Sequence, residues 1–94
     1  MGVPRSFVYV TRFRGGPALR APLKLEISPT GDLWFDLYSP ALNLGGVGET
    51  VDAAFADLEG TVLSVWEEYR ATAHEKMTED ALALFGKLRA LFVA

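Results

Sequence analysis

Two short runs of alternating apolar and polar residues, separated by turn-forming residues, most constrain how this chain folds. They span 23–28 and 33–39, and their apolar positions are Leu23, Leu25, Ile27, Leu33, Phe35 and Leu37. Successive side chains point to opposite faces of a strand, so each run predicts a strand with one apolar face. Pro29 and Gly31 lie between the runs and favour a tight connection, because proline presets one turn position and glycine accepts a left-handed one. We therefore expect a β-hairpin with one face in the core.

A long amphipathic helix is predicted over about 51–71. Its apolar residues recur at intervals of three and four positions and are Val51, Phe55, Leu58, Val62, Val65, Trp66 and Tyr69. This period is that of one face of an α-helix. Thr50 is expected to cap its start, since a hydroxyl accepts a bond from a free backbone N–H of the first turn. A second line of small residues includes Ala56 and Gly60, and indicates either a second contact face or a tolerated surface glycine.

The rest of the chain supplies further elements of the same domain. Residues 7–14 predict a strand rich in aromatic and β-branched residues, followed by a loop to Pro22. Residues 42–47 form either a short strand or a loop, and Thr78 is expected to cap a last helix over about 79–92. The fold class predicted is α+β: one domain over 1–94, with an antiparallel sheet of three or four strands packed by one long helix, plus a C-terminal helix.

The apolar content indicates a partner surface. Half of the 94 residues are hydrophobic and 22% are charged, which is apolar-rich for so small a domain. The last helix is apolar over more than half of its circumference, so we expect its own domain to bury one side and a partner chain the other. The prediction is a homo-oligomer, dimer or tetramer, with an interface drawn from Trp34, Tyr38, Ala56, Gly60, Leu84, Phe85, Leu88 and Phe92.

No arrangement typical of catalysis, cofactor binding or metal binding is present in the sequence. It has no cysteine and a single histidine, His74, which argues against zinc sites, disulfides and histidine-dependent triads. The glycines at 45–48 precede a helix but match no phosphate-binding motif. Glu26 and Asp36 share the outer face of the predicted hairpin with Lys24, and a surface charge cluster explains them better than an acid–base pair.

Charge is divided unevenly along the chain. Residues 1–25 carry +5 and residues 26–94 carry −8. The basic segment could meet phosphate or an acidic partner, or it could lie beside the acidic helix within the same fold, which we favour. No apolar run is long enough to span a membrane, and the expected location is the cytoplasm.

An alternative function follows from four residues. Trp34 and Tyr38 lie two positions apart on one predicted strand and would form an aromatic platform. With Arg12 and Arg14 on a neighbouring strand, such a platform would suit RNA or another single-stranded nucleic acid.

The stretch 23–69 resembles the N-terminal domain of HicB-type antitoxins. The matching residues are Leu23-Lys24-Leu25-Glu26-Ile27, Gly31-Asp32-Leu33-Trp34-Phe35, Ser39-Pro40, Leu44-Gly45, Gly48-Glu49-Thr50-Val51-Asp52-Ala53-Ala54 and Leu58-Glu59. The tail is similar to that of HicB-like proteins without further domains, through Trp66-Glu67-Glu68-Tyr69 and Thr78-Glu79-Asp80-Ala81.

This resemblance implies a partial RNase H-like fold without the RNase H carboxylates, and a role in binding a small ribonuclease toxin. HicB-type antitoxins usually carry a C-terminal DNA-binding domain. The residues after Tyr69 are enough for one helix only, so we expect this chain to lack that domain. The sequence thus predicts a non-catalytic protein-interaction domain.

Overall fold

A computed structural model describes residues 6–16, 18–30 and 34–92. In chain order it contains strands β1 (Ser6–Arg12), β2 (Ala18–Thr30), β3 (Trp34–Ser39) and β4 (Leu44–Gly48), helix α1 (Val51–Ala71), the 3-10 helix η1 (His74–Lys76) and helix α2 (Glu79–Leu91). The α+β prediction is confirmed, and β4 is a strand rather than a loop. The predicted hairpin turn at Gly31 and Asp32, together with Leu33, lies outside the described residues.

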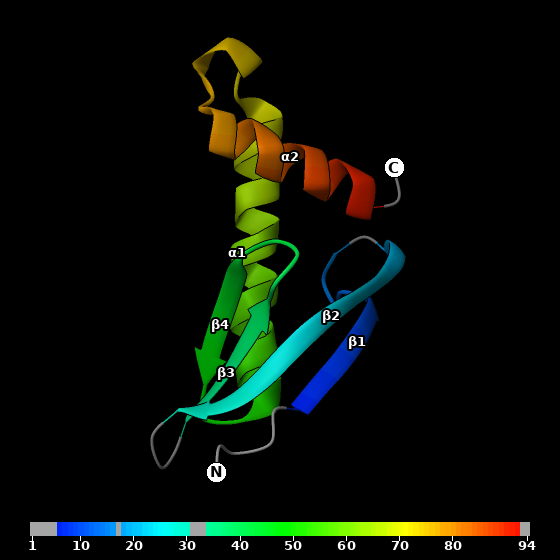
Figure 1. Cartoon of the computed structure of the whole chain (residues 1–94), viewed down its shortest axis with the longest axis vertical. Coiled ribbons are helices and arrows are strands. Elements are labelled where there is room, and N and C mark those ends of the chain that lie inside the picture. Colours follow the sequence, from blue (N-terminus) through cyan, green and yellow to red (C-terminus); the bar gives the residue numbers. More distant parts are fainter. Residues whose placement is uncertain (1–5, 17, 31–33, 93–94) are drawn as a thin grey trace.

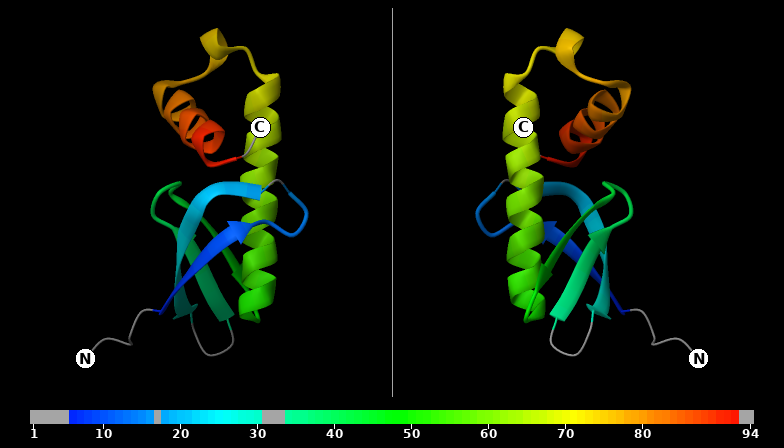
Figure 2. Two further views of the ribbon diagram at one scale, coloured as in Figure 1. Left: turned by 90° about the vertical axis from the view of Figure 1, so that its right-hand side faces the viewer. Right: turned by 90° about the vertical axis from the view of Figure 1, so that its left-hand side faces the viewer.

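The four strands form one antiparallel sheet in the order β1-β2-β3-β4. Helix α1 lies across one face of this sheet, and no described element covers the other face (Figure 1). Figure 2 shows the two layers edge-on, with α1 on one side of the strands. At 1.5 Å per residue, α1 is about 32 Å long, whereas β3 spans about 20 Å. The C-terminal half of α1 therefore extends past the sheet, where α2 packs against it.

The predicted loop before Pro22 is wrong, because β2 already begins at Ala18. Its pairing with β1 is irregular: Val10 faces Leu23, whereas Arg12 faces Ala18. Pro22 lies in this irregular stretch. Proline lacks an N–H for the strand ladder, and a bulge is one of the few places in a sheet that tolerate it. The proline that looked like a strand boundary instead bends a long strand.

Two glycines of β4 determine how closely α1 approaches the sheet. A Cβ atom added to Gly46 would lie 2.3 Å from the backbone nitrogen of Leu58, and one added to Gly48 would lie 2.5 Å from that of Ala54. No real Cβ makes such contacts, so only glycine lets the helix backbone rest directly on this strand. The segment 45–48 is thus a packing surface for a helix, in agreement with the absence of a phosphate-binding motif.

This contact also sets the rotation of α1. Ala54, Leu58 and Val62 are fully buried, while Val51, which the helical period placed on the buried stripe, is 38% exposed. The small side chain of Ala54 faces the glycines of β4, where a larger residue would hold the helix away. Thr50 caps the helix as predicted: the N–H of Ala53 donates to its Oγ1 at 3.0 Å.

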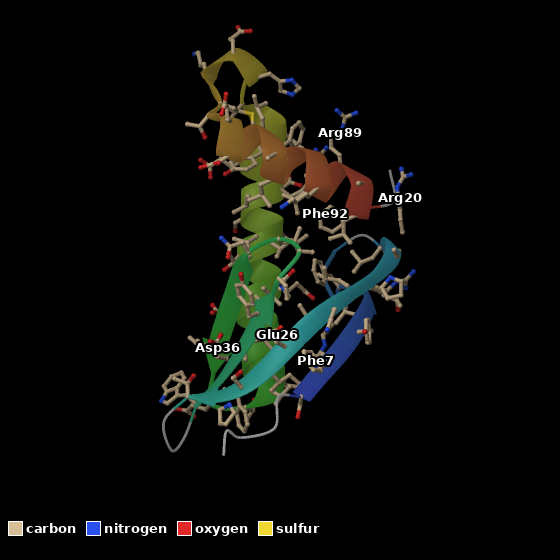
Figure 3. All side chains as sticks on the ribbon, in the orientation of Figure 1. Phe7, Arg20, Glu26, Asp36, Arg89 and Phe92 are labelled. Carbon is tan, nitrogen blue, oxygen red and sulfur yellow. The ribbon has the colours of Figure 1, made fainter. Side chains whose placement is uncertain are left out.

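Helix α2 is held by an aromatic cluster that also includes the β1–β2 connection and α1. Phe92 is buried between Phe13 and Trp66, with ring centroids 5.9 and 5.3 Å away, and Phe85 lies 5.5 Å from Trp66. At the same end, Arg20 donates through Nε to the carbonyl oxygen of Phe92 at 2.9 Å (Figure 3). Edge-on and tilted aromatic pairs of this kind add stability beyond the area they bury.

Three residues predicted to face a partner chain lie in this chain's own core. Phe85, Leu88 and Phe92 are 9%, 0% and 2% exposed. The wide apolar band of α2 has two neighbours within the domain. One side packs against α1, and on the other side Leu84 and Leu91 are partly buried against the hydrophobic core. The prediction that a second chain buries one side of α2 is not needed to explain its composition.

Of the basic N-terminal segment, the part around Arg14 lies beside the acidic helix α1. The carboxylate of Glu59 accepts bonds from the backbone N–H groups of Arg14 and Gly15, at 2.7 and 3.0 Å. Arg14 also pairs with Asp52 at 2.8 Å, but both side chains are largely exposed, so this ion pair contributes little. Glu59 therefore fixes the turn between β1 and β2 to the middle of α1.

The close contact between Gly46 and α1 predicts that adding a single methyl group strongly lowers the stability of the fold. Gly46→Ala should lower the free energy of unfolding by at least about 2 kcal/mol, because the new Cβ meets helix backbone that cannot move aside locally. Urea denaturation measures this change. The control is Gly60→Ala, where a Cβ meets nothing within 4 Å; it should raise stability by up to about 1 kcal/mol. Equal effects of the two substitutions would contradict the close approach.

The Glu59 contact gives a second prediction. Glu59→Ala should cost about 1–3 kcal/mol, because it removes a charged acceptor from two backbone donors. Glu67→Ala is the matched control on the same helix. Among the described residues Glu67 pairs with the exposed Arg70 alone, so its loss should change stability by about 0.5 kcal/mol or less. The same urea titration reads both; a Glu59 variant as stable as the Glu67 variant would argue against this role.

Candidate interaction surface

The face of the sheet opposite α1 is covered by no described element, and we call it the open face. The strand register places on it side chains from all four strands: Phe7 and Tyr9 of β1, Lys24, Glu26 and Ser28 of β2, Trp34, Asp36 and Tyr38 of β3, and Val47 of β4. Large apolar side chains at its margins are well exposed: Phe7 by 44%, Tyr9 by 66%, Trp34 by 47% and Val47 by 49%.

The middle of the open face is acidic. Glu26 lies opposite Tyr38, and Asp36 is two positions from Tyr38 on β3, so the two carboxylates are diagonal neighbours on adjacent strands. Figure 3 shows both on the side of the sheet that faces the viewer. The expected neutralising residue, Lys24, instead places its Nζ over the ring of Phe7, 4.1 Å from the centroid. Among the described residues, neither carboxylate forms an ion pair.

The side chain of Tyr38 is held by a hydrogen bond to the β3–β4 turn. Its hydroxyl donates to Oδ1 of Asn43, which lies in the β3–β4 turn with φ of 55°. Asparagine tolerates this left-handed conformation better than most residues. The N–H of Asn43 donates to the carbonyl of Ser39 at 2.8 Å, and the buried hydroxyl of Ser39 accepts from the N–H of Leu42. The ring of Tyr38 is thus half-buried and held in place rather than free to stack on a ligand.

The four residues of the nucleic-acid alternative do not share one surface. Trp34 pairs with Thr30 at one end of β2, whereas Arg12 pairs with Ala18 at the other end of the same strand. Arg14 lies beyond Arg12, on the α1 side, where it binds Asp52. Trp34 and the arginines therefore lie at opposite ends of the sheet, while Tyr38 lies nearer the middle, opposite Glu26.

The residues predicted for an oligomer interface fall into separate regions. Trp34 and Tyr38 lie on the open face, and Leu84 is half-buried beside Leu42 and Tyr69. Ala56 and Gly60 are exposed on the side of α1 away from the sheet, and no atom lies within 4 Å of a Cβ built at Gly60. The close contact between α1 and β4 is made at Ala54 instead, on the opposite side of the helix.

Three exposed residues of the open face were not predicted. In β1, aromatic residues alternate with valines, so both faces are apolar and the pattern alone cannot tell which one faces the core. The structure shows that Val8 and Val10 face α1, which leaves Phe7 and Tyr9 outside. Val47 lies between glycines, where alternation gives no signal. The register with Asp36 is what places it on the open face.

Other surfaces are less suited to chemistry. His74 lies in η1 with its ring 5.4 Å from that of Phe85, and the described part of the chain holds no group of three metal-binding side chains. A groove of about 570 Å³ between α2 and the β3–β4 turn is mostly apolar, lined by Leu23, Leu42, Leu91 and their neighbours.

Among the described helices, none is both long and apolar enough to cross a membrane.

Comparisons with known proteins add no relative. Neither the protein-family models, nor the curated proteins, nor the solved structures with which the chain was compared give a match.

Proposed function

We propose that this chain is a non-catalytic protein-interaction domain that uses the open face to bind a basic protein. The observation that carries the proposal is the pattern on that face: exposed aromatic side chains surround two carboxylates that no described cation neutralises. Large aromatic residues with few rotatable bonds supply most of the binding energy at protein interfaces, and uncompensated charge selects partners of opposite sign.

The open setting of the two carboxylates among the described residues supports the non-catalytic part of the proposal. Glu26 and Asp36 lie on the open face of the sheet, and neither lines a pocket among the described residues. On such a surface a guanidinium or ammonium group can approach both carboxylates at once, with aromatic rings beside it.

The resemblance to HicB-type antitoxins indicates which class of protein the partner belongs to. Such proteins bind small ribonuclease toxins, and a ribonuclease that handles polyanionic RNA presents the positive surface that an acidic centre recognises. A small basic reading frame next to the gene is therefore the partner to test first. We propose inhibition by covering that basic surface, without any reaction.

Binding of the purified neighbouring protein, measured by calorimetry, tests this function. Trp34→Ala should weaken binding roughly tenfold to a hundredfold, as expected for loss of an aromatic anchor, and Asp36→Lys should weaken it further at low salt. Leu82→Ala removes a similarly exposed apolar side chain from α2 and should leave affinity unchanged. A complex that tolerates both open-face substitutions, or a gene without such a neighbour, would count against the proposal.

A further inference from the structure

The two edges of the sheet differ in how they are protected. At the β4 edge, the N–H of Val47 donates to Oδ2 of Asp57 at 3.0 Å, so a side chain of α1 occupies a backbone group that could otherwise pair with another strand. At the β1 edge, no described residue pairs with the outer side of Ser6–Arg12. Its first six residues contain no charge and no proline, the usual devices that block strand addition.

Strand β1 also leaves apolar surface on both of its faces. On the open face, Phe7 and Tyr9 are 44% and 66% exposed. On the other face, Val8 and Val10 are half-buried and line a cleft of about 400 Å³ against Phe55 and the start of α1. A strand added here would gain backbone hydrogen bonds and cover apolar side chains on two sides.

Charge determines which orientation of a second copy fits this edge. Arg12 lies at one end of β1. Glu49, between β4 and α1, lies at the level of the other end, because Ser6 pairs with Ile27 while Gly48 and Pro29 both pair with Phe35. An antiparallel second copy would bring Arg12 to the acidic end of its neighbour. A parallel copy would instead place the arginines side by side, which is unfavourable.

We propose that β1 pairs antiparallel with β1 of a second copy, so that two sheets join into one continuous sheet across a two-fold axis. Such an interface is self-complementary, as closed dimers require. The axis passes beside one residue, which lies opposite the same residue of the other copy. In every other pair the two residue numbers are both odd or both even. All aromatic side chains of β1 therefore stay on the open face in any such register.

This assembly goes beyond the proposed function, because it requires no other protein. It leaves Trp34 and Val47 free and doubles the open face. Failure of the two proposals can be told apart: Trp34→Ala should weaken partner binding without changing the dimer.

Because the chain has no cysteine, single introduced cysteines can locate the axis. We would oxidise four variants separately: Phe7→Cys, Val8→Cys, Tyr9→Cys and Val10→Cys. Directly opposed residues of antiparallel strands have Cα atoms about 4.5–5.5 Å apart, within the range a disulfide spans. One variant should form a disulfide-linked dimer much faster than the other three. Val47→Cys on the protected edge should not cross-link. Cross-linking of Val47→Cys at the rate of the best β1 variant would overturn the proposal.

Light scattering gives an independent test. The wild-type chain should be a dimer at about 100 µM, and Tyr9→Lys should raise its dissociation constant at least tenfold, since a lysine on each strand opposes pairing. Val47→Lys, at an exposed position on the other edge strand, should leave the constant unchanged. A monomeric wild type, or equal weakening by both substitutions, would refute edge pairing.

The orientation has its own test. Arg12→Glu and Glu49→Lys should each weaken the dimer, and the two together should restore part of the loss, because the swapped charges again face opposite signs. A double variant weaker than either single one would exclude the antiparallel arrangement.

Discussion

The backbone contact between β4 and α1 organises the rest of this molecule. Because Gly46 and Gly48 carry no side chain, the helix lies against an edge strand of the sheet, with Ala54 and Leu58 at the contact. A helix so placed covers β3 and β4 well and leaves the α1-facing side of β1 only half covered. How far α1 covers each strand thus follows from the position that Gly46 and Gly48 allow the helix to take.

The second organising feature is the use of α2. Its aromatic residues fill the space above the sheet, where α1 extends beyond the strands, and Phe92 connects them to Phe13 of the β1–β2 connection. Apolar residues that suggested a partner chain therefore complete this domain. The exposed apolar surface lies elsewhere, on the open face and along β1, and combines aromatic side chains with valines.

Much of the fold could be predicted from the sequence, because its signals are local. Alternation identified β2 and β3, and threonine caps marked the starts of both helices. What failed depends on distant contacts. The start of β2 was missed because Pro22 reads as a break unless the bulge opposite β1 is known. Val51 was placed in the core because a helical period fixes the apolar stripe but not which part of it meets the sheet.

The same limit applies to the candidate site. Trp34, Tyr38, Glu26 and Asp36 could be assigned to one face of a hairpin from alternation alone. That Lys24 lies over Phe7, and so leaves those carboxylates unneutralised, depends on the register between β1 and β2. No pattern within one strand contains that information. The association with HicB-type antitoxins remains a proposal, supported by the residues of the hairpin and the helix start.

The hydrogen bond from Val47 to Asp57 has a consequence for how large an assembly can grow. A sheet with two free edges can add strands at both ends without limit, which is the route to fibres. In this chain one edge is occupied by its own helix. Growth by strand addition can then proceed from β1 alone, and a single addition uses up that edge on both molecules. One carboxylate thereby occupies a backbone donor of the β4 edge and disfavours strand addition there.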